Sequence, residues 1–295
     1  MKILLTGSTG FLGRTILKEL SNFQVVTLSR NNSEINADLT AGKIELPKVN
    51  AVIHAAGKAH LVPKTQKEIV EFASVNVGGT KNLLNSLETN LPESFVFISS
   101  VSVYGRLEGD LISEEAPLNA SDPYGLSKIQ AEAIIQSWCL RNNVKLSILR
   151  LPLLVGANPP GNLGSMIRAI RNGYYVDIAG GKARKSMVRA QDVACILPKV
   201  IEVGGTYNLT DGFHPSVSEL SQLIALQLGK RQSPNVPAWL AMILAKAGDL
   251  LGRKSPFNSA KLSKLTSNLT FDDSKARKVL GWAPNPVLEN SIIGD

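Results

Sequence analysis

The sequence predicts an α/β protein with a doubly wound parallel sheet and a smaller C-terminal α/β region. Apolar runs of strand length alternate with helical patterns over the first half of the 295 residues. Uninterrupted Val, Ile and Leu runs are typical of strands whose two faces are both covered by helices. A glycine-rich segment also follows the first run. Because ligands of such sheets bind at the carboxyl ends of the strands, the residues just after each run are the functional candidates.

Five strands and three helices are expected in the first half of the chain. The expected strands are Lys2–Leu5, Gln24–Leu28, Ala51–His54, Phe95–Ser99 and Lys145–Leu149, and the expected helices are Phe11–Leu20, Val75–Leu87 and Tyr124–Trp138. The pattern becomes irregular after Arg150, with a loop expected over residues 151–164 and connections at Gly204-Gly205 and Arg253–Ser267. We therefore expect a first domain over residues 1–150 and a second region over 151–295, some of whose segments return to the sheet.

The charge balance narrows the class of partner. The formal net charge of +8 favours anionic partners, namely nucleic acid, a membrane surface or phosphorylated small molecules. The sequence has no basic stripe interleaved with aromatic residues and no helix-turn-helix or zinc pattern, so we expect no nucleic-acid binding. No apolar stretch reaches the roughly 18 residues of a membrane span. The run from Trp239 to Leu251 carries Lys246 and Asp249, which indicates an amphipathic or buried helix. We expect a cytoplasmic protein.

A phosphate-binding loop is predicted near the N-terminus. Thr6-Gly7-Ser8-Thr9-Gly10-Phe11-Leu12-Gly13 follows the first strand and opens the first helix. Glycines permit a tight turn and a close backbone approach to a pyrophosphate, and the helix N-terminus presents unpaired N–H groups with partial positive charge. Three glycines between a strand and a helix therefore predict a dinucleotide-binding domain of Rossmann type over residues 1–150. Its expected loop contacts are Gly7, Thr9, Gly10, Phe11, Leu12 and Gly13.

The end of the second strand predicts which dinucleotide is bound. A carboxylate there would bind the ribose hydroxyls of NAD, whereas a 2′-phosphate requires a cation. The sequence places Ser29 at this position and Arg30 beside it. A guanidinium pairs with phosphate through two charge-assisted hydrogen bonds. We therefore predict NADP(H) as the preferred cofactor, and NAD(H) is the alternative if Arg30 is only a solvated strand-end residue.

A tyrosine and a lysine at helical spacing form the candidate catalytic pair. Tyr124 and Lys128 are four residues apart at the start of an expected helix, so their side chains share one face. A nearby ammonium favours phenolate and lowers the tyrosine pKa from its usual value of about 10. Such a tyrosine suits proton exchange with a substrate. Ser100 and Ser102 follow the strand Phe95–Ser99, where a serine hydroxyl can hydrogen-bond a substrate carbonyl or alcohol beside the tyrosine.

These motifs occur in a characteristic order along the chain. The order is the glycine loop, Ile53-His54-Ala55-Ala56-Gly57, Asn76, Ser99-Ser100…Val103-Tyr104-Gly105 and Tyr124…Lys128. Together they resemble the extended short-chain dehydrogenases, particularly nucleotide-sugar epimerases, reductases and dehydratases. The resemblance extends to the C-terminus, where Leu269–Ala276 and Leu280-Gly281-Trp282 are similar to the family's pattern. It implies a nicotinamide-dependent enzyme. A non-catalytic dinucleotide-sensing protein is the further alternative, against which the intact Ser100, Tyr124 and Lys128 argue.

The resemblance implies a role for each matching residue. Ser100 matches the catalytic serine, Tyr124 the proton donor or acceptor, and Lys128 the lysine that binds ribose and lowers the tyrosine pKa. The implied cofactor-lining residues beyond the glycine loop are Ser29, Arg30, Asp38, Leu39, Ala55, Ala56, Gly57, Asn76, Tyr124 and Lys128. His54 is expected to be structural.

Two positions narrow the implied reaction. The family's dehydratases carry an Asp-Glu pair where this sequence has Val101 and Ser102, so a 4,6-dehydratase is not expected. Because Ser29 and Arg30 favour NADPH, the expected activity is reduction of a 4-keto nucleotide sugar, UDP-linked and either 6-deoxy or N-acetylamino-deoxy. The alternative is an NAD-dependent nucleotide-sugar 4-epimerase. The same scaffold also reduces steroids and flavonols.

The resemblance also implies which residues bind the substrate. Ser100 and Ser102 would contact the sugar, and Asn162 matches a family asparagine at the diphosphate. Arg184 and Lys185 lie near the position at which the family often has a phosphate-binding arginine, so they would bind the substrate phosphate. The alternative is that both are solvated surface residues.

The remaining expectations concern partners and metals. The family commonly dimerises through the helix that bears the Tyr/Lys pair, so a homodimer is expected. Cys139 and Cys195 lie far apart without a second cysteine nearby, which predicts neither a disulfide framework nor a metal site.

Overall fold

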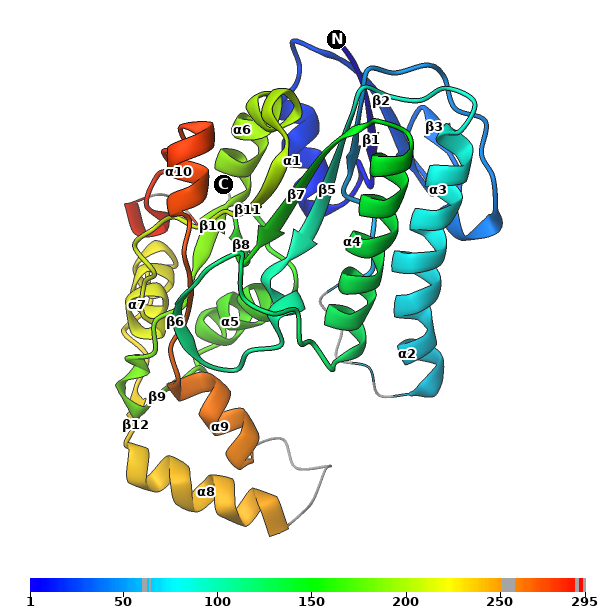
Figure 1. Ribbon diagram of the computed structural model, residues 1–295. Coiled ribbons are helices and arrows are strands. Elements are labelled where there is room, and N and C mark those ends of the chain that lie inside the picture. The colour runs from blue at the N-terminus through cyan, green and yellow to red at the C-terminus, as the bar shows by residue number, and fades with distance from the viewer. Residues whose placement is uncertain (60–62, 64, 251–257, 290–291, 294–295) are drawn as a thin grey trace.

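A computed structural model describes residues 1–59, 63, 65–250, 258–289 and 292–293. Its centre is a seven-stranded sheet in the order β11-β7-β5-β4-β1-β2-β3 (Figure 1). The strands are β1 (Lys2–Thr6), β2 (Gln24–Ser29), β3 (Ile35–Asn36), β4 (Ala51–His54), β5 (Ser94–Ser100), β7 (Lys145–Leu151) and β11 (Gly205–Asn208). All neighbouring strands pair in parallel. The predicted doubly wound α/β fold is therefore confirmed.

Helices cover both faces of the sheet because successive strand residues point to opposite faces. One face carries α1 (Phe11–Glu19), α6 (Ala190–Val203) and α10 (Ser274–Leu280), whose apolar residues share a core with Ile3 and Leu5 of β1. The other face carries α3 (Gly79–Leu87) and α4 (Pro123–Arg141), whose apolar residues share a core with Leu4. Helix α2 (Gln66–Phe72) continues into α3 through a π-helical turn, η2 (Ala73–Gly78).

Every strand and helix expected in the first half is present, and Ala51–His54 is a strand with the expected ends. The expected helix over 75–87 begins as the π-helical turn rather than as an α-helix. The expected connection at Gly204-Gly205 was wrong, because β11 starts at Gly205. Strand β11 lies at the edge of the sheet and pairs only with β7. Its sequence, Gly-Thr-Tyr-Asn, therefore lacks the apolar run that is typical of the central strands.

The C-terminal region combines short strand pairs with helices. The strand pairs are β8 (Leu153–Val155) with β10 (Met187–Arg189), β9 (Asp177–Ile178) with β12 (Asn235–Val236), and β6 (Gly109–Ile112) with β13 (Leu269–Phe271). The α-helices are α5 (Gly161–Arg171), α7 (Val217–Gln227), α8 (Ala238–Leu250) and α9 (Ser259–Thr266). The 3-10 turns of the whole chain include η1 (Leu39–Ala41), η3 (Val101–Tyr104), η4 (Ala179–Gly181) and η6 (Val287–Glu289). Helices α5 and α7 share a separate apolar core with β8 and β10.

Two further expectations for this region need correction. Residues 153–155 are a strand within the expected loop, and residues 259–266 are helical within the expected connection Arg253–Ser267. Residues 251–257, with the expected end of the helix at Leu251, lie outside the described residues.

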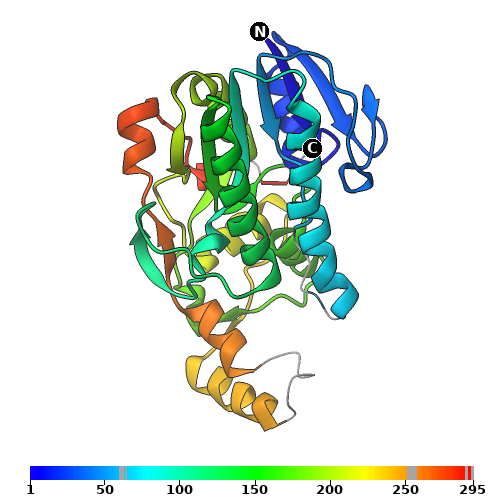
Figure 2. The same ribbon diagram turned by 45° about the vertical axis from the view of Figure 1, so that its right-hand side comes forward.

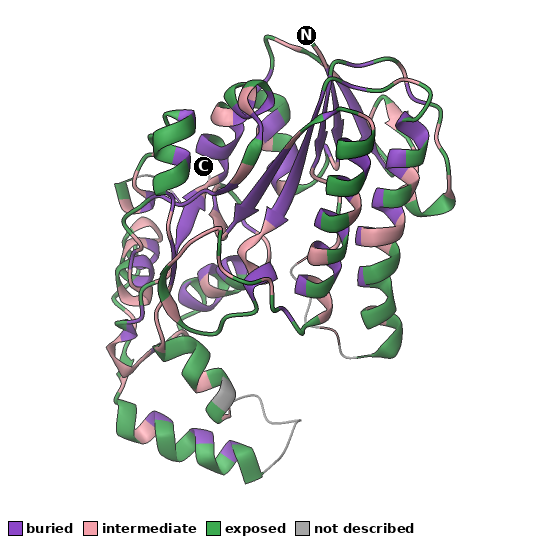
Figure 3. Cartoon of the chain, in the orientation of Figure 1, coloured by how far each residue is buried: buried purple, intermediate pink, exposed green. Residues whose placement is uncertain are grey.

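Helices α8 and α9 project from the body of the molecule in both ribbon views (Figures 1 and 2). Among the helices that the structure describes, none is long and apolar enough to cross a membrane. Figure 3 shows α8 exposed over most of its surface, whereas the central strands are buried.

Candidate active site

The glycine loop connects β1 to α1 at the carboxyl edge of the sheet. Gly7 has a φ of 71°, in the left-handed region that favours glycine, and a Cβ on it would lie 2.7 Å from the Ala56 nitrogen. Gly13 packs directly on the Gly7 carbonyl oxygen, where a side chain has no room. Gly10 precedes α1 without a side-chain cap. The first N–H groups of α1 are therefore left for a ligand, and a pyrophosphate is the group they suit.

The other predicted loop residues differ in exposure. Leu12 is buried in the core, Phe11 is half-buried, and Thr9 is exposed. A Cβ on Gly156 would lie 3.2 Å from the Phe11 ring. Leu12 thus anchors the loop in the apolar core, whereas Thr9 is open to solvent.

The end of β2 lies beside this loop. The Ser29 hydroxyl accepts a hydrogen bond from the Thr9 N–H at 3.3 Å. Arg30 follows as an exposed residue. Hydrogen bonds from Thr40 and, to a smaller extent, the positive charge of Arg30 lower the pKa of Asp38. The Ser29 hydroxyl therefore lies next to the phosphate loop, at the position where a carboxylate would bind the ribose of NAD, and the exposed Arg30 follows it in the chain.

Asn76 joins the segment after β4 to the helix that carries the tyrosine and lysine. It is buried in the π-helical turn η2. Its side-chain oxygen accepts from the Lys58 N–H at 2.7 Å, and its amide donates to the Ser127 hydroxyl at 2.8 Å. A Cβ on Gly57 would lie 3.1 Å from the Asn76 oxygen and 3.5 Å from Lys128 Nζ. Gly57, Asn76 and Lys128 are thus neighbours, and π-helical turns are frequent at functional sites.

The remaining predicted cofactor residues flank this cluster. The Ala56 N–H donates to the Thr6 hydroxyl at 3.2 Å, and Ala55 packs against the apolar core. The Leu39 carbonyl accepts a hydrogen bond from the Asn82 side chain at 2.8 Å.

The candidate catalytic side chains come from β5 and α4. Tyr124 is the second residue of α4, whose start is capped by the Asp122 carboxylate. Ser100 ends β5, and its side chain hydrogen-bonds the Tyr124 hydroxyl. Lys128 is buried one helical turn later and donates to the Ile98 carbonyl at 2.8 Å. The fold therefore brings Ser100, Tyr124 and Lys128 to one place.

The predicted lowering of the Tyr124 pKa is not found. Burial raises the pKa of Tyr124, the hydrogen bond from Ser100 opposes this effect, and Asp122 adds to it. The Lys128 ammonium is engaged by the Ile98 carbonyl and lies 4.6 Å from the centre of the Phe97 ring. Burial lowers the pKa of Lys128 to about 8, against an opposing effect of Glu132. Desolvation thus dominates both groups, and Tyr124 is a neutral phenol at pH 7.

A buried hydroxyl without a partner lies next to these side chains. Within the part of the chain that the structure describes, Ser102 Oγ is the buried side-chain polar atom with no hydrogen-bond partner. A Cβ on Gly125 would lie 2.8 Å from the Ser102 carbonyl oxygen, so the start of α4 closely approaches this turn. Buried polar groups normally have partners. The open hydroxyl of Ser102 and the uncapped α1 therefore fit a polar ligand that spans from the glycine loop to α4.

Two of the predicted substrate residues, Arg184 and Lys185, hydrogen-bond to carbonyls of the C-terminal region. Asn162 is exposed in the first turn of α5. Arg184 donates to the Phe213 and His214 carbonyls at 3.2 Å. Lys185 donates to two carbonyls at the end of α9, the nearer at 2.7 Å, and burial lowers its pKa. The Lys185 hydrogen bonds fix the backbone at the end of α9, and those of Arg184 fix the segment before α7. A role for these residues in substrate binding stays a prediction.

A buried ion pair below the site was missed by sequence reasoning. Arg150 Nη2 lies 2.8 Å from Glu132 Oε2, and Ser99 donates to the same carboxylate at 2.5 Å. Arg150 also donates to the Tyr104 hydroxyl at 3.1 Å. Glu132 follows Lys128 by four residues, just as Lys128 follows Tyr124, so the helical spacing contained a signal for it. The pair holds the strand that ends in Ser100 against α4.

His54 has no free ring nitrogen. Its Nδ1 lies 2.7 Å from the Thr6 hydroxyl and its Nε2 lies 2.9 Å from the Thr80 hydroxyl. Burial lowers the pKa of His54 to about 3, and the positive charge of Lys128 adds to this effect. The imidazole is therefore a neutral link between β1 and α3.

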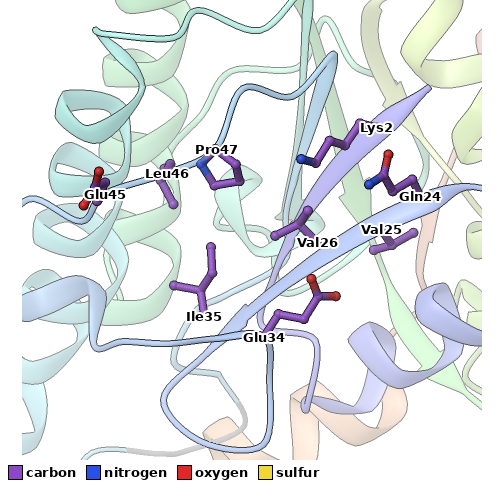
Figure 4. A pocket seen from close by; sticks show the side chains of 9 residues that line it. All are labelled: Lys2, Gln24, Val25, Val26, Glu34, Ile35, Glu45, Leu46 and Pro47. Carbon is purple, nitrogen blue, oxygen red and sulfur yellow. The ribbon is translucent and has the colours of Figure 1, made fainter.

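A separate pocket of about 630 Å³ lies over β2 near the outer edge of the sheet (Figure 4). Its lining includes Val26, Ile35 and Leu46. None of the predicted site residues lines it, so the pocket does not belong to the candidate active site.

Comparison with known proteins identifies the family. Residues 3–210 match the NAD dependent epimerase/dehydratase family. The chain belongs to this family. A UDP-glucose 4-epimerase of Vibrio cholerae is 28% identical and aligns with 98% of this chain and 93% of its own length. An N-acetyl-α-D-glucosaminyl-diphospho-ditrans,octacis-undecaprenol 4-epimerase of Escherichia coli O157:H7 is 25% identical, with 92% and 88% covered.

Solved structures have the same fold. A UDP-glucose 4-epimerase from Thermotoga maritima, solved with UDP-glucose, has a TM-score of 0.77 at 20% identity and covers 98% of this chain and 95% of its own. The structure of RMD from Pseudomonas aeruginosa complexed with NADPH has a TM-score of 0.74 at 21% identity, covering 99% and 96%.

Family membership confirms the predicted resemblance to the extended short-chain dehydrogenases. The protein is a nicotinamide-dependent enzyme of the oxidoreductase or epimerase type. The glycine loop, the end of β2 and the Asn76 cluster are the parts of this chain that fit a nicotinamide dinucleotide.

Proposed function

We propose that this enzyme uses NADPH to reduce the C4 ketone of a nucleotide sugar, which is a UDP-linked 6-deoxy or N-acetylamino-deoxy hexose. The end of β2 carries the proposal. Ser29 presents a hydroxyl, where a carboxylate would repel a 2′-phosphate, and Arg30 adds an exposed cation beside it. A net ketone reduction consumes NADPH, whereas an epimerase recovers the hydride that it removes.

The residues of the chain would control the substrate oxygen. When NADPH is bound beside these residues, its hydride would be available for C4 of the sugar. Ser100 donates a hydrogen bond to the ketone oxygen, and Tyr124 donates the proton that completes the alcohol. Because burial raises the Tyr124 pKa, the phenol is protonated at neutral pH, as a proton donor must be. Lys128, a neighbour of Gly57 and Asn76, binds the ribose hydroxyls.

The residues that follow Ser100 argue against elimination of water. Val101 is apolar and Ser102 carries only a hydroxyl. Neither side chain supplies the carboxyl groups for general acid and base catalysis that the family's dehydratases place at these two positions.

Epimerisation at C4 is the second candidate. It is favoured by the names of the two relatives described above, which are 4-epimerases of UDP-glucose and of an undecaprenyl-diphosphate sugar. In that reaction Tyr124 would accept a proton from the C4 alcohol and later return it, and the cofactor would be NAD. The two candidates therefore differ in cofactor and in net redox change.

Cofactor titration separates them. We expect purified protein to bind NADPH at least tenfold more tightly than NADH, followed by fluorescence of the reduced nicotinamide. The Arg30→Ala variant should lose most of this preference, whereas Arg171→Ala, an exposed arginine at the end of α5, should keep it. Equal binding of both cofactors, or tightly bound NAD in the purified protein, would favour the epimerase.

Replacement of the tyrosine tests whether the site is catalytic. Tyr124→Phe should lower turnover of UDP-4-keto sugars by about 10²–10⁴-fold and leave NADPH binding intact. Tyr174→Phe, on an exposed tyrosine, is the matched control and should retain full activity. Unchanged turnover in Tyr124→Phe would contradict the proposed mechanism.

We further propose that the enzyme is a cytoplasmic homodimer that assembles through α4. A hollow of about 430 Å³ lies between α3 and α4, with Leu84, Ile134 and Trp138 in its lining, and is a surface that a second copy could fill. Light scattering of the wild type and of Ile134→Glu checks this assembly, and the variant should be monomeric.

A further inference from the structure

Helix α8 leaves its large apolar side chains in solvent. Trp239 is 62% exposed, Ile243 is 57% exposed and Leu250 is 90% exposed. Their spacing of four and seven residues places all three on one face of the helix. Met242 is also exposed beside them. The outward face of α8 is therefore apolar, and Figure 3 shows that most of the helix is exposed.

The opposite face of α8 explains why the large residues point outward. Ala241, Ala245 and Gly248 are the buried residues of α8, and the helix packs against α9. The Asp249 carboxylate fixes this contact by accepting hydrogen bonds from the Ser259 N–H and hydroxyl. The pair of helices is thus held through small residues and one polar anchor. The outward apolar face of α8 is therefore available to a binding partner.

The described segment around this face has an excess of positive charge. The described residues 230–250 and 258–267 contain five Lys or Arg and one acidic residue, a net charge of +4. Lys246 of α8 and Lys264 of α9 are exposed. Lys246 lies on the same helical face as Ile243 and Leu250, and long lysine side chains let apolar neighbours insert while the ammonium stays at the polar boundary.

We propose that the outward face of α8 docks onto an anionic lipid bilayer surface. Exposed Trp, Ile and Leu with surrounding lysines are the composition of helices that lie in the membrane interface, and anionic lipid headgroups attract clustered Lys and Arg. Charge decides against a second copy of this chain, because two such faces would bring like net charges together. Nucleic acid is disfavoured because the outward face is apolar rather than basic.

Docking through α8 also sets the orientation of the active site. In Figures 1 and 2 the strands run toward the end of the molecule that carries α8 and α9. The carboxyl edge of the sheet, with the glycine loop and Tyr124, therefore faces the side on which the bilayer would lie. A bound enzyme keeps its catalytic edge turned toward the membrane surface.

Tryptophan fluorescence measures the docking directly. Trp138 and Trp282 are each 4% exposed, so a change on membrane binding reports Trp239. We expect a blue shift and co-sedimentation with vesicles of phosphatidylglycerol and phosphatidylcholine, and neither with pure phosphatidylcholine. Salt at 0.5 M should weaken the binding, since exposed charges are screened. Trp239→Phe should lose the shift and keep most of the sedimentation.

Matched variants test the face itself. Ile243→Glu should reduce vesicle binding at least tenfold, while Leu226→Glu, at a 76% exposed position of α7, should leave it unchanged. NADPH binding, which neither change touches, verifies that both variants are folded. Absence of binding to anionic vesicles, or equal binding to neutral ones, overturns the proposal. A dimer that Ile243→Glu converts to monomer, without vesicle binding, also overturns it and assigns the face to a second copy.

Discussion

Helices α6 and α8 are both rich in apolar residues and similar in length, with 14 and 13 residues, yet the fold uses them in opposite ways. Helix α6 buries Val193, Leu197 and Ile201 against the sheet. Helix α8 buries only alanine and glycine and exposes its large side chains. Composition thus indicates that a helix is apolar but not which face is covered. The covered face is set by where the small and large residues fall around the helix.

The contrast predicts different costs for the same truncation in the two helices. Leu197→Ala in α6 removes a fully buried side chain and should lower the free energy of unfolding by about 2–5 kcal/mol. Leu244→Ala in α8 removes an exposed one and should stay within about 0.5 kcal/mol. Urea denaturation measures both. Equal losses would mean that α8 is packed against another surface in solution.

The two regions also differ in their titratable groups, since His54 is buried in strand β4 of the sheet and Asp249 is exposed on α8. The unfolded chain protonates His54 near its ordinary pKa of 6.5, whereas the folded chain keeps it neutral to about 3. The contribution of neutral His54 to the free energy of unfolding is therefore fully present above its pKa in the unfolded chain. It falls as the pH decreases toward the pKa of His54 in the folded chain, by about 2 kcal/mol at pH 5.

This pH dependence can be assigned by comparing two variants in denaturation experiments at pH 7 and pH 5. His54→Gln should remove most of the loss. Asp249→Asn should leave the loss between these pH values as it is in the wild type. A steep loss that survives in His54→Gln would place the responsible group elsewhere.

The smallest expected effect is on the local stability of α8 and α9. The Asn258 side chain caps α9 by accepting from the Lys261 N–H at 2.9 Å. Asn258→Ala should destabilise this helix by about 1 kcal/mol. Hydrogen exchange should become faster in α8 and α9 and stay unchanged in the central strands. Faster exchange throughout the sheet would show that the two helices unfold together with the body.

Sequence alone predicted the parts of the molecule that depend on local pattern. The central strands were predictable because their apolar runs are buried on both faces, and Gly7 and Gly13 were predictable because close backbone contacts leave no room for a side chain. Tyr124 and Lys128 followed from helical spacing. The meeting of Ser100 with Tyr124 needed the order of the strands, which the family resemblance supplied.

Features that depend on tertiary contacts were not predictable in this way. The raised pKa of Tyr124 follows from burial that the spacing of Tyr124 and Lys128 does not reveal. The hydrogen bonds of Lys185 to carbonyls at the end of α9 depend on residues that lie about 80 positions later in the chain. The exposure of α8 depends on its packing with α9.

Most of the helices that cover one face of the sheet are synthesised after its central strands. Helices α6 and α10 and the buried Trp282, which donates to the Thr210 carbonyl at 2.9 Å, cover a face whose central strands are complete at Leu151. At about 5–20 residues per second, a ribosome needs on the order of ten seconds to add these segments. During that interval only α1 covers this face of the nascent sheet, and the rest is an exposed apolar surface of the kind that chaperones bind.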